Sequence, residues 1–493
     1  YDGPISQAVA FEKLLARGED FADRLMAGFD DTRDWPQLLH IATDGETYGH
    51  HQRFGDMALA YALQHLDNNG PVRLTNYGEY LEKHPATHEA EIIENSSWSC
   101  IHGIERWRNN CGCNSGGYAN WNQEWRAPLR NALDWLRDRT TTLFESKGRE
   151  LLKDPWQARD DYISVVLDRS EKNINAFCER NALRSLNADE KADVLKLLEI
   201  QRHAMLMYTS CGWFFDELSG IETVQIMKYA AGVIQLSRDL LHEDLESLFL
   251  AKLALAKSNL PEHRNGANIY EKFVRPSVID LKKAGAHYAV SSLFEEYPDE
   301  VTIYCYRIRR EDYLINRAGR TQLALGKIFV TSEITGEQDL ISFCVIHFGE
   351  HSFNGGVRTF RGEEAYSVMK AEVSTAFETG DFAEIVRLMD KHFGMHNYSL
   401  KDLFADEQRK ILGTVITSTI EEYEAAYRSM YENSRHMMAF LQETGIPLPR
   451  AFLTAAELTL NHDLKQSFSG ETIDIEQVRA AADEVQHEEA HHL

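Results

Sequence analysis

The chain has 493 residues and carries 52 Lys and Arg side chains against 77 Asp and Glu, a formal net charge of −25 at pH 7. This charge repels phosphate backbones and acidic membrane surfaces, so we predict no nucleic-acid partner. No apolar run approaches the roughly 20 residues that span a bilayer, and no secretory signal opens the chain, so we predict no membrane partner either.

An apolar run at Leu38–Ala42 follows a predicted helix over residues 4–28 and lies between Pro36 and Gly45, which favours a buried strand. In barrels and doubly wound sheets, reactive groups gather at the carboxyl ends of such strands. We therefore predict an active site where this run ends, and the alternative is an ordinary solvated turn. The polar groups gathered there are Asp44, Glu46, His50 and His51.

The spacing of Asp44 and Glu46 limits what this pair can do alone. On an extended strand the two carboxylates share a face at roughly 6.6 Å, which overlaps the range of inverting glycosidases and exceeds the roughly 5 to 5.5 Å of retaining ones. Neighbours on one strand approach a sugar from the same side, whereas the mechanism needs carboxylates on opposite sides of the scissile bond. A second catalytic carboxylate should therefore come from another strand.

Two segments carry a resemblance to a known family. The sequence Asp44-Gly45-Glu46-Thr47-Tyr48-Gly49 resembles the D-G-E-x-F-G segment of glycoside hydrolase family 57, at the end of the last barrel strand, with Tyr48 in place of Phe. The sequence Ser96–Ile104 is similar to the Trp and His-Gly region of the helices that cap that barrel. The resemblance covers residue 1 to about residue 130, and the rest resembles the long C-terminal domain of unknown function of large bacterial members.

This resemblance implies that Asp44 is the general acid/base of a retaining mechanism on α-linked glucans, with Trp98 and His102 lining the sugar subsites. Family members place the nucleophilic Glu well before the D-G-E segment, and only 43 residues precede Asp44. We therefore interpret the chain, which begins with Tyr1, as the C-terminal portion of a longer protein with the nucleophile upstream, and we predict that it hydrolyses no glucan alone. The predicted substrate-binding residues are Glu46, His50, His51, Trp98, His102, Trp121, Trp213 and Asp216.

Seven cysteines, an odd number, are typical of a reducing compartment, so we predict a cytoplasmic protein. Only Cys100, Cys111 and Cys113 cluster. The Cys-Gly-Cys sequence at 111–113 lacks the C-x-x-C spacing of zinc ribbons, and a site with four ligands would have to recruit His102. The sequence therefore favours a glycine-rich substrate loop at 111–117, with no metal and no cofactor.

Residues 118–125 combine aromatic and amide side chains around Trp121, a composition that suits sugars as well as a packed loop. From about residue 126 to 285 the pattern is helical, and the apolar run at 201–220 predicts a buried helix. Trp213 and Asp216 lie near its end, where the family has a Trp and an Asp on a comparable helix, so we predict that they reach the sugar.

Runs rich in β-branched and aromatic residues at 301–308, 321–330 and 340–348 predict an antiparallel sheet. The sequence His347-Phe348-Gly349-Glu350-His351 matches the H-x-x-E-H string of some zinc proteases, which present both histidines on a helix. Here the string follows a strand and contains a glycine, so we predict no protease site.

The predicted fold is mostly α with α/β and antiparallel β parts, beginning with the remnant of an incomplete (β/α)7 barrel. We predict four parts. Residues 1–128 form the C-terminal part of the barrel with its substrate loops, residues 129–295 a helical bundle, residues 296–360 an antiparallel sheet and residues 361–493 a helical region.

The leading functional hypothesis is a carbohydrate-active enzyme that hydrolyses or transfers α-linked glucosyl units of an oligo- or polysaccharide. Asp44 would protonate the leaving oxygen and then deprotonate water or an acceptor hydroxyl. One alternative is a metal-dependent deacetylase-like hydrolase with ligands Asp44, Glu46, His50 and His51. Another is a non-catalytic module that binds glycans or holds an assembly together.

Overall fold

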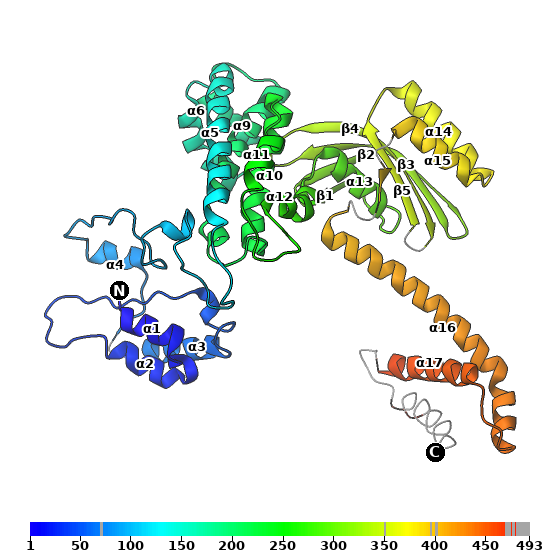
Figure 1. The fold of residues 1–493 in the computed structure, drawn as a ribbon, viewed down its shortest axis with the longest axis horizontal. Helices are drawn as coiled ribbons and strands as arrows, with labels where there is room; N and C mark the ends of the chain where they lie inside the picture. Colours follow the sequence, from blue (N-terminus) through cyan, green and yellow to red (C-terminus); the bar gives the residue numbers. More distant parts are fainter. Residues whose placement is uncertain are drawn as a thin grey trace. The chain divides into compact units, whose positions relative to one another are not determined.

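The computed structural model describes residues 1–69, 72–349, 352–394, 397–399 and 403–468, together with residues 475 and 479. The chain divides into two compact units, Tyr1–Asn95 and Ser96–Leu493. Helices occur in both units and one antiparallel sheet lies in the second, so the fold is mostly α with an antiparallel β part, as predicted (Figure 1). No described helix is both long and apolar enough to cross a membrane.

The first unit is a small cluster of helices. Asp2 caps the first of them, because its carboxylate accepts the N–H of Ile5 at 2.8 Å and Pro4 occupies the first turn. The buried side chains of Ile5, Val9 and Phe21 form the core together with Ala62 and Leu66. The elements are α1 (Gly3–Phe11), η1 (Leu14–Ala16), α2 (Gly18–Met26), η2 (Gly45–Thr47), α3 (Gly55–Asn69) and α4 (Tyr77–Lys83).

The prediction of a strand at Leu38–Ala42 is wrong, and no strand of a barrel occurs in the described residues of this unit. A strand needs a neighbour for its backbone groups, and this run bonds to the start of α1 instead. The His40 carbonyl accepts the N–H of Asp2 at 2.9 Å, and the N–H of Ala42 donates to Ser6 Oγ at 3.2 Å. Leu39 of this run still packs against the hydrophobic core of the first unit.

The second unit begins with a helical bundle. Its core places Leu129, Leu133 and Leu136 on one face of the first long helix, at helical spacing, with Ile200 and Met227 among the buried side chains they join. The elements are η3 (Glu105–Trp107), α5 (Arg126–Leu151), α6 (Pro155–Asp161), α7 (Ile163–Leu167), α8 (Glu171–Asn181), α9 (Ala188–Leu206), η4 (Ser210–Trp213), α10 (Ile221–Leu241), α11 (Glu246–Leu253), α12 (Gly266–Ile269), η5 (Tyr270–Val274), η6 (Arg275–Ser277) and α13 (Leu281–Ser291).

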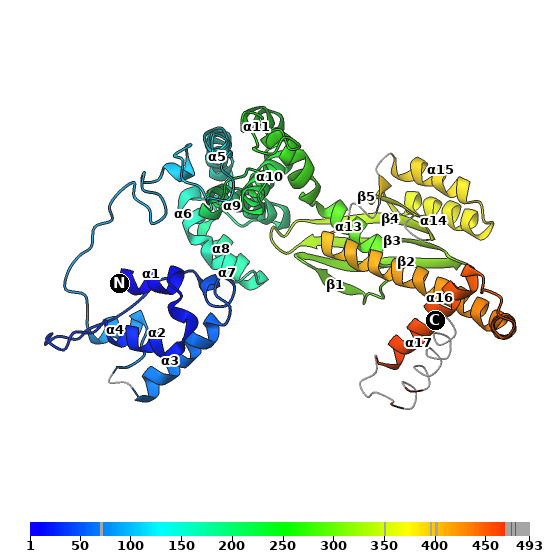
Figure 2. The ribbon, with the colours of Figure 1, turned by 60° about the horizontal axis from the view of Figure 1, so that its bottom comes forward.

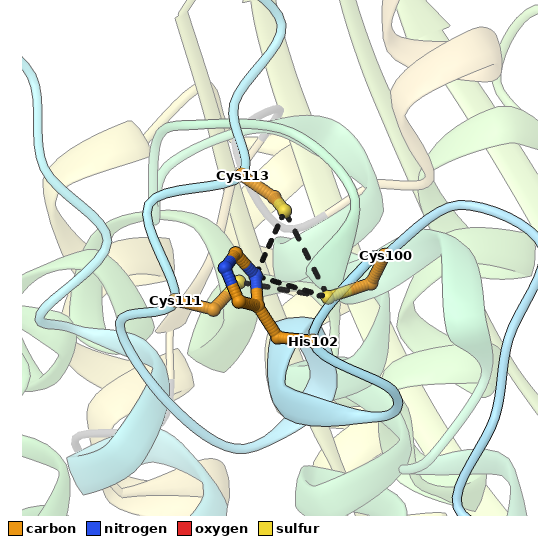
Figure 3. Close-up of side chains that lie close together, drawn as sticks. All are labelled: Cys100, His102, Cys111 and Cys113. Carbon is orange, nitrogen blue, oxygen red and sulfur yellow. Dashed lines mark hydrogen bonds between the residues drawn. The ribbon is translucent and has the colours of Figure 1, made fainter.

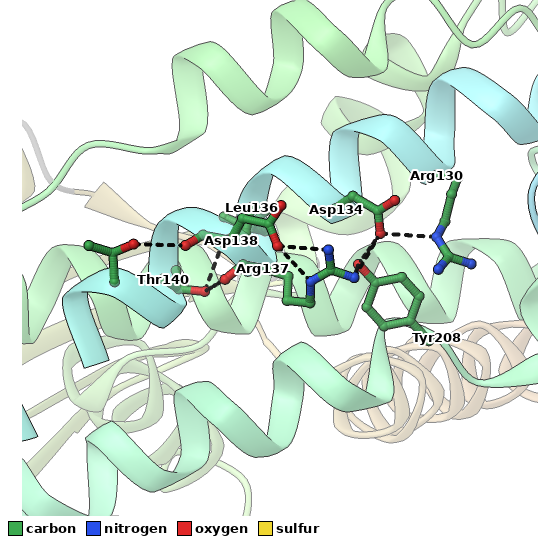
Figure 4. Close-up of polar contacts among 8 residues, drawn as sticks. Arg130, Asp134, Leu136, Arg137, Asp138, Thr140 and Tyr208 are labelled. Atoms are coloured by element: carbon green, nitrogen blue, oxygen red, sulfur yellow. Dashed lines mark hydrogen bonds and ion pairs between the residues drawn. The ribbon is translucent and has the colours of Figure 1, made fainter. Parts of the chain in front are cut away.

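A polar network on α5 fixes the turn that follows α9 (Figure 4). Asp134 Oδ1 accepts hydrogen bonds from Tyr208 Oη at 2.7 Å and from Arg130 Nε and Arg137 Nη1, both at 3.0 Å. The carboxylate is thus shared by two guanidinium groups and a phenol. Burial and the bond to Asp134 both raise the pKa of Tyr208.

In the part of the chain that the structure describes, the sheet has six strands in sequence order, each antiparallel to its neighbours. Its strands are β1 (Glu300–Ile303), β2 (Tyr306–Ala318), β3 (Thr321–Ser332), β4 (Gln338–Gly349), β5 (Ser352–Thr359) and β6 (Asn397–Tyr398). The register of β2 on β3 shifts between Arg310 and Asp312, and Gly326 pairs with Tyr313 just after this bulge. A Cβ on Gly326 would be 2.3 Å from the Asp312 carbonyl, so only glycine fits there.

Helices cover both faces of the sheet (Figures 1 and 2). Leu323 and Leu325 of β3 pack against α14 (Glu363–Glu378) and α15 (Phe382–Phe393), while Ala324 and Ile328 face the side occupied by α13. Successive apolar side chains of β3 are thus buried on opposite faces of the sheet, so both faces of this strand are covered. His347 lies in β4, on a strand as predicted, and Glu350 and His351 lie outside the described residues.

Two further helices, α16 (Ala405–Glu443) and α17 (Arg450–Ser467), pack against each other. Tyr431 and Met438 of α16 bury themselves against Ala455 and Leu460 of α17. Arg428 and Asp463 form an ion pair across the same pair of helices. The helical region predicted after residue 361 is therefore present in the described residues.

Candidate active-site loop and a cysteine–histidine cluster

The Asp44–Gly49 segment is a turn held by its own backbone. The Asp44 carbonyl accepts the N–H of Thr47 at 3.0 Å, and the Glu46 carbonyl accepts the N–H groups of His50 at 3.1 Å and His51 at 2.9 Å. Thr47 is buried, and Gly49 has φ +131°, a conformation that other residues rarely adopt. The turn is therefore closely determined, although no strand leads into it.

The polar side chains of this turn point to solvent. Asp44, Glu46, His50 and His51 are all exposed, and His51 Nε2 lies 3.6 Å from Glu46 Oε2. These four side chains are not a convergent ligand set: within the described parts of the chain, the only group of His, Cys, Asp and Glu donors close enough to hold a metal lies elsewhere. Nothing in this geometry favours the deacetylase alternative.

That group consists of Cys100, His102, Cys111 and Cys113, whose donor atoms all lie within 4.8 Å of one another (Figure 3). Cys100 Sγ is 3.9 Å from Cys111 Sγ, 3.8 Å from Cys113 Sγ and 3.8 Å from His102 Nδ1. Cys113 Sγ is 3.6 Å from the same nitrogen. The four side chains come from two short turns, Cys-x-His and Cys-x-Cys, and point toward a common centre.

Backbone donors surround the sulfurs of the cluster. Burial alone would raise the pKa of the Cys100 thiol, but the N–H groups of His102 and Arg106, with the His102 ring and Cys113, lower it to about 7. Cys111 accepts the N–H of Cys113, yet burial and the neighbouring sulfurs raise its pKa. One thiolate of the cluster is thus favoured near neutral pH.

Two buried arginines lie against the cluster. Arg126, fully buried at the start of α5, donates from Nη1 to the Cys113 carbonyl at 3.2 Å. Arg106, 6% exposed, donates to the Phe214 carbonyl at 3.3 Å and stacks on the Phe214 ring at 4.4 Å. Burial lowers the pKa of Arg126, and the nearby Cys111 opposes this shift. Sequence reasoning did not select either arginine, since a lone Arg carries no spacing signal.

A family model described as Domain of unknown function (DUF3536) matches residues 121–404, more than half of the chain. The chain belongs to the DUF3536 family. No curated protein and no solved structure matches it. The expected C-terminal domain of unknown function is confirmed at this level, and the DUF3536 match carries no statement about glycoside hydrolases. The cysteine–histidine cluster lies before the matched region, whereas Arg126 lies inside it.

Within the DUF3536 match, two predicted sugar contacts belong to the core. Trp213 is 1% exposed and stacks on Trp125, with ring centroids 6.5 Å apart. Asp216 is 4% exposed, and its carboxylate accepts the N–H of Ser115 at 3.0 and 2.9 Å as well as the Ser115 hydroxyl. The prediction that these two side chains contact a sugar is corrected: Trp213 packs the bundle, and Asp216 fastens the loop at 111–117.

Two other predicted aromatic contacts are accessible. Trp98 is 82% exposed and lies over Phe214, with ring centroids 6.1 Å apart. Trp121, at the start of the DUF3536 match, is half-buried and stacks on Tyr118 at 3.9 Å. Both aromatic faces flank the cluster in sequence. His102, predicted to bind sugar, turns its Nδ1 toward the cysteines instead.

Proposed function

We propose that the chain is part of a carbohydrate-active enzyme that hydrolyses or transfers α-linked glucosyl units, with Asp44 as the general acid/base. The observation that carries the proposal is the D-G-E-T-Y-G turn, which resembles glycoside hydrolase family 57. Its backbone bonds and the buried Thr47 hold the Asp44 carboxyl at the surface of the unit, free of an ion pair to any described residue. An exposed carboxyl in a fixed turn is available to a polymeric substrate.

In this proposal Asp44 donates a proton to the bridging oxygen as the glycosidic bond breaks. It then removes a proton from water or from an acceptor hydroxyl, which attacks the glycosyl intermediate. Glu46 lies on the same turn and approaches from the same side, so it does not serve as the nucleophile. We propose that a glutamate outside this chain does.

The exposed aromatic faces support a role in sugar binding. Sugars stack their apolar C–H faces on aromatic rings, and Trp98 and the Tyr118–Trp121 pair offer such faces in the second unit. All seven cysteines are free, which suits the reducing cytoplasm in which we place the enzyme.

The test measures reducing-sugar release from soluble starch by the chain alone and by the natural protein in which it occurs. We expect no release by the chain alone, and release by the whole protein that falls roughly 10²- to 10⁴-fold in Asp44→Ala. Asp34→Asn, which changes an exposed carboxylate of the same unit, is the matched control.

The acid/base role has a further signature. Because Asp44 assists the leaving group in the first step, Asp44→Ala should lose much less kcat/KM on a substrate whose leaving group needs no proton, such as a glucosyl fluoride. The kcat should still fall, because Asp44 also acts as the base in the second step. Undiminished starch hydrolysis by Asp44→Ala would reject the proposal. Glucan binding by both variants without turnover in the whole protein would favour a non-catalytic binding module.

A further inference from the structure

We propose that Cys100, His102, Cys111 and Cys113 bind one zinc ion, which holds together the irregular segment at 96–125. Three thiolates and one imidazole form one of the standard ligand sets of structural zinc. A full set of four protein ligands leaves no open position for water or substrate. The inferred role is therefore structural, and it does not depend on the carbohydrate proposal.

The distances between donor atoms fit a tetrahedral ion. With Zn–S bonds of about 2.3 Å and a Zn–N bond of about 2.05 Å, a tetrahedron separates sulfurs by about 3.8 Å and sulfur from nitrogen by about 3.6 Å. Two of the three S–S distances are 3.8 and 3.9 Å, and two of the three S–N distances are 3.6 and 3.8 Å. The two remaining pairs, Cys111 with Cys113 and Cys111 with His102, lie within 4.8 Å. A disulfide would need sulfurs about 2.05 Å apart and would leave His102 without a role.

The two turns present their ligands in the same way. In the first, the N–H of His102 bonds to the sulfur of Cys100, two residues before it. In the second, the N–H of Cys113 bonds to the sulfur of Cys111, again two residues before it. Such backbone bonds orient a ligand and distribute the charge of a thiolate, as outer-sphere partners do in metal sites.

Charge gives an independent argument. Arg106 and Arg126 are buried beside the cluster, and the Nε atoms of both have no hydrogen-bond partner among the residues that the structure describes. A buried cation is costly unless an anion compensates for it. Zinc with three thiolates carries one net negative charge, which together with the Asp216 carboxylate near Arg126 would compensate for the two buried cations.

The segment itself has little secondary structure to order it. Between Ser96 and Trp125, all of which the structure describes, the only helix or strand is the three-residue η3. Stretches longer than about 12–15 residues without secondary structure are uncommon in compact units. Zinc would join residues 100–102 to residues 111–113, as metal binding supplies folding free energy in small metal-stabilised modules.

The experiment measures metal in the full chain, purified without chelators, by inductively coupled plasma mass spectrometry. We expect about one zinc per chain, falling below about 0.1 in Cys100→Ser and in Cys113→Ser. Cys211→Ser removes an exposed cysteine outside the cluster and should keep its zinc. Less than about 0.1 zinc in the unsubstituted chain, iron with sulfide in place of zinc, or zinc unaffected by both cluster substitutions would overturn the proposal.

A second measurement covers variants that fail to fold. The unsubstituted chain, stripped of zinc and loaded with Co²⁺, should show the visible absorption of tetrahedral cobalt and the near-ultraviolet charge-transfer bands of thiolate ligation. His102→Cys should fold, keep one zinc and shift these bands, because it converts the ligand set to four thiolates. An octahedral cobalt spectrum, or a spectrum identical in His102→Cys, would also reject the site.

Discussion

Asp216→Asn separates two roles for a buried carboxylate. The sequence assigned Asp216 to the substrate, whereas the structure shows it accepting two contacts from the Ser115 N–H and one from the Ser115 hydroxyl. Hydrogen bonds to charged groups contribute about 1.5–3 kcal/mol, against about 1 kcal/mol for neutral ones. Asparagine keeps the shape of the side chain but removes its charge, and its NH2 group puts a donor in place of one of the two accepting oxygens. We expect the loop at 111–117 to lose about 2 kcal/mol of local stability.

Hydrogen exchange followed by mass spectrometry measures this loss directly. A change of about 2 kcal/mol corresponds to roughly 30-fold faster exchange, since about 1.4 kcal/mol is a factor of ten. Peptides covering Ser115 and Gly116 should show it, while peptides from the sheet should not change. Asp138→Asn is the control, because Asp138 forms only an exposed ion pair with Arg137 at 2.7 Å.

Unchanged exchange at 111–117 in Asp216→Asn would show that the Asp216 carboxylate does not stabilise this loop. A variant with unchanged exchange and weakened glucan binding would instead support the substrate contact inferred from the sequence. Loss of both would mean that the loop itself binds the glucan.

Three further predictions concern stability, each measured by urea unfolding. Burial lowers the pKa of His287 from 6.5 to about 4. The free energy of unfolding should therefore be highest above pH 6.5 and fall by up to about 3 kcal/mol as the pH falls toward 4. His287→Phe should remove this pH dependence. Tyr208→Phe deletes the 2.7 Å bond to Asp134 and should cost about 1–2 kcal/mol, whereas Tyr423→Phe, at an exposed position, should be neutral. Gly326→Ala forces a Cβ against the Asp312 carbonyl and should cost about 3 kcal/mol, whereas Gly413→Ala, in open space on α16, should stabilise by up to about 1 kcal/mol.

Periodicity identified the elements whose partners are close in sequence. The leucines of α5 recur at helical spacing, and the β-rich runs near residues 306, 321 and 340 are separated by turns at Gly319 and Gly336, both of which have positive φ. Both patterns involve residues that are close in sequence, so they can be recognised without knowledge of the rest of the fold. The run at Leu38–Ala42 has the composition of a strand, but a strand exists only where another strand accepts its hydrogen bonds.

The exposure of the site residues could not be predicted from the sequence, because burial depends on contacts with residues far away in the chain. Trp213 and Trp98 have the same chemistry, yet one is 1% exposed and the other 82%. The cysteine cluster was visible as a composition, but the expected zinc spacing was C-x-x-C. Only the fold shows that the Cys-x-His and Cys-x-Cys turns meet, and that Arg106 and Arg126 are buried beside them.

The zinc and carbohydrate proposals meet in one further prediction. Trp98 lies two residues before Cys100, and the Tyr118–Trp121 pair follows Cys113, so the position of both aromatic faces depends on the order of this segment. Immobilising a side chain on binding costs about 0.5–1.5 kcal/mol, and a metal that fixes two such faces in advance removes that cost.

We therefore expect Cys113→Ser to weaken binding of a maltooligosaccharide by roughly tenfold, or about 1.4 kcal/mol, measured by isothermal titration calorimetry. Trp98→Ala should act in the same direction, and Trp35→Ala, which removes an exposed tryptophan of the first unit, should not. Full affinity in zinc-free Cys113→Ser together with weakened binding by Trp98→Ala would show that the aromatic face needs no metal to order it. Unchanged binding in every variant would remove this segment from the sugar site.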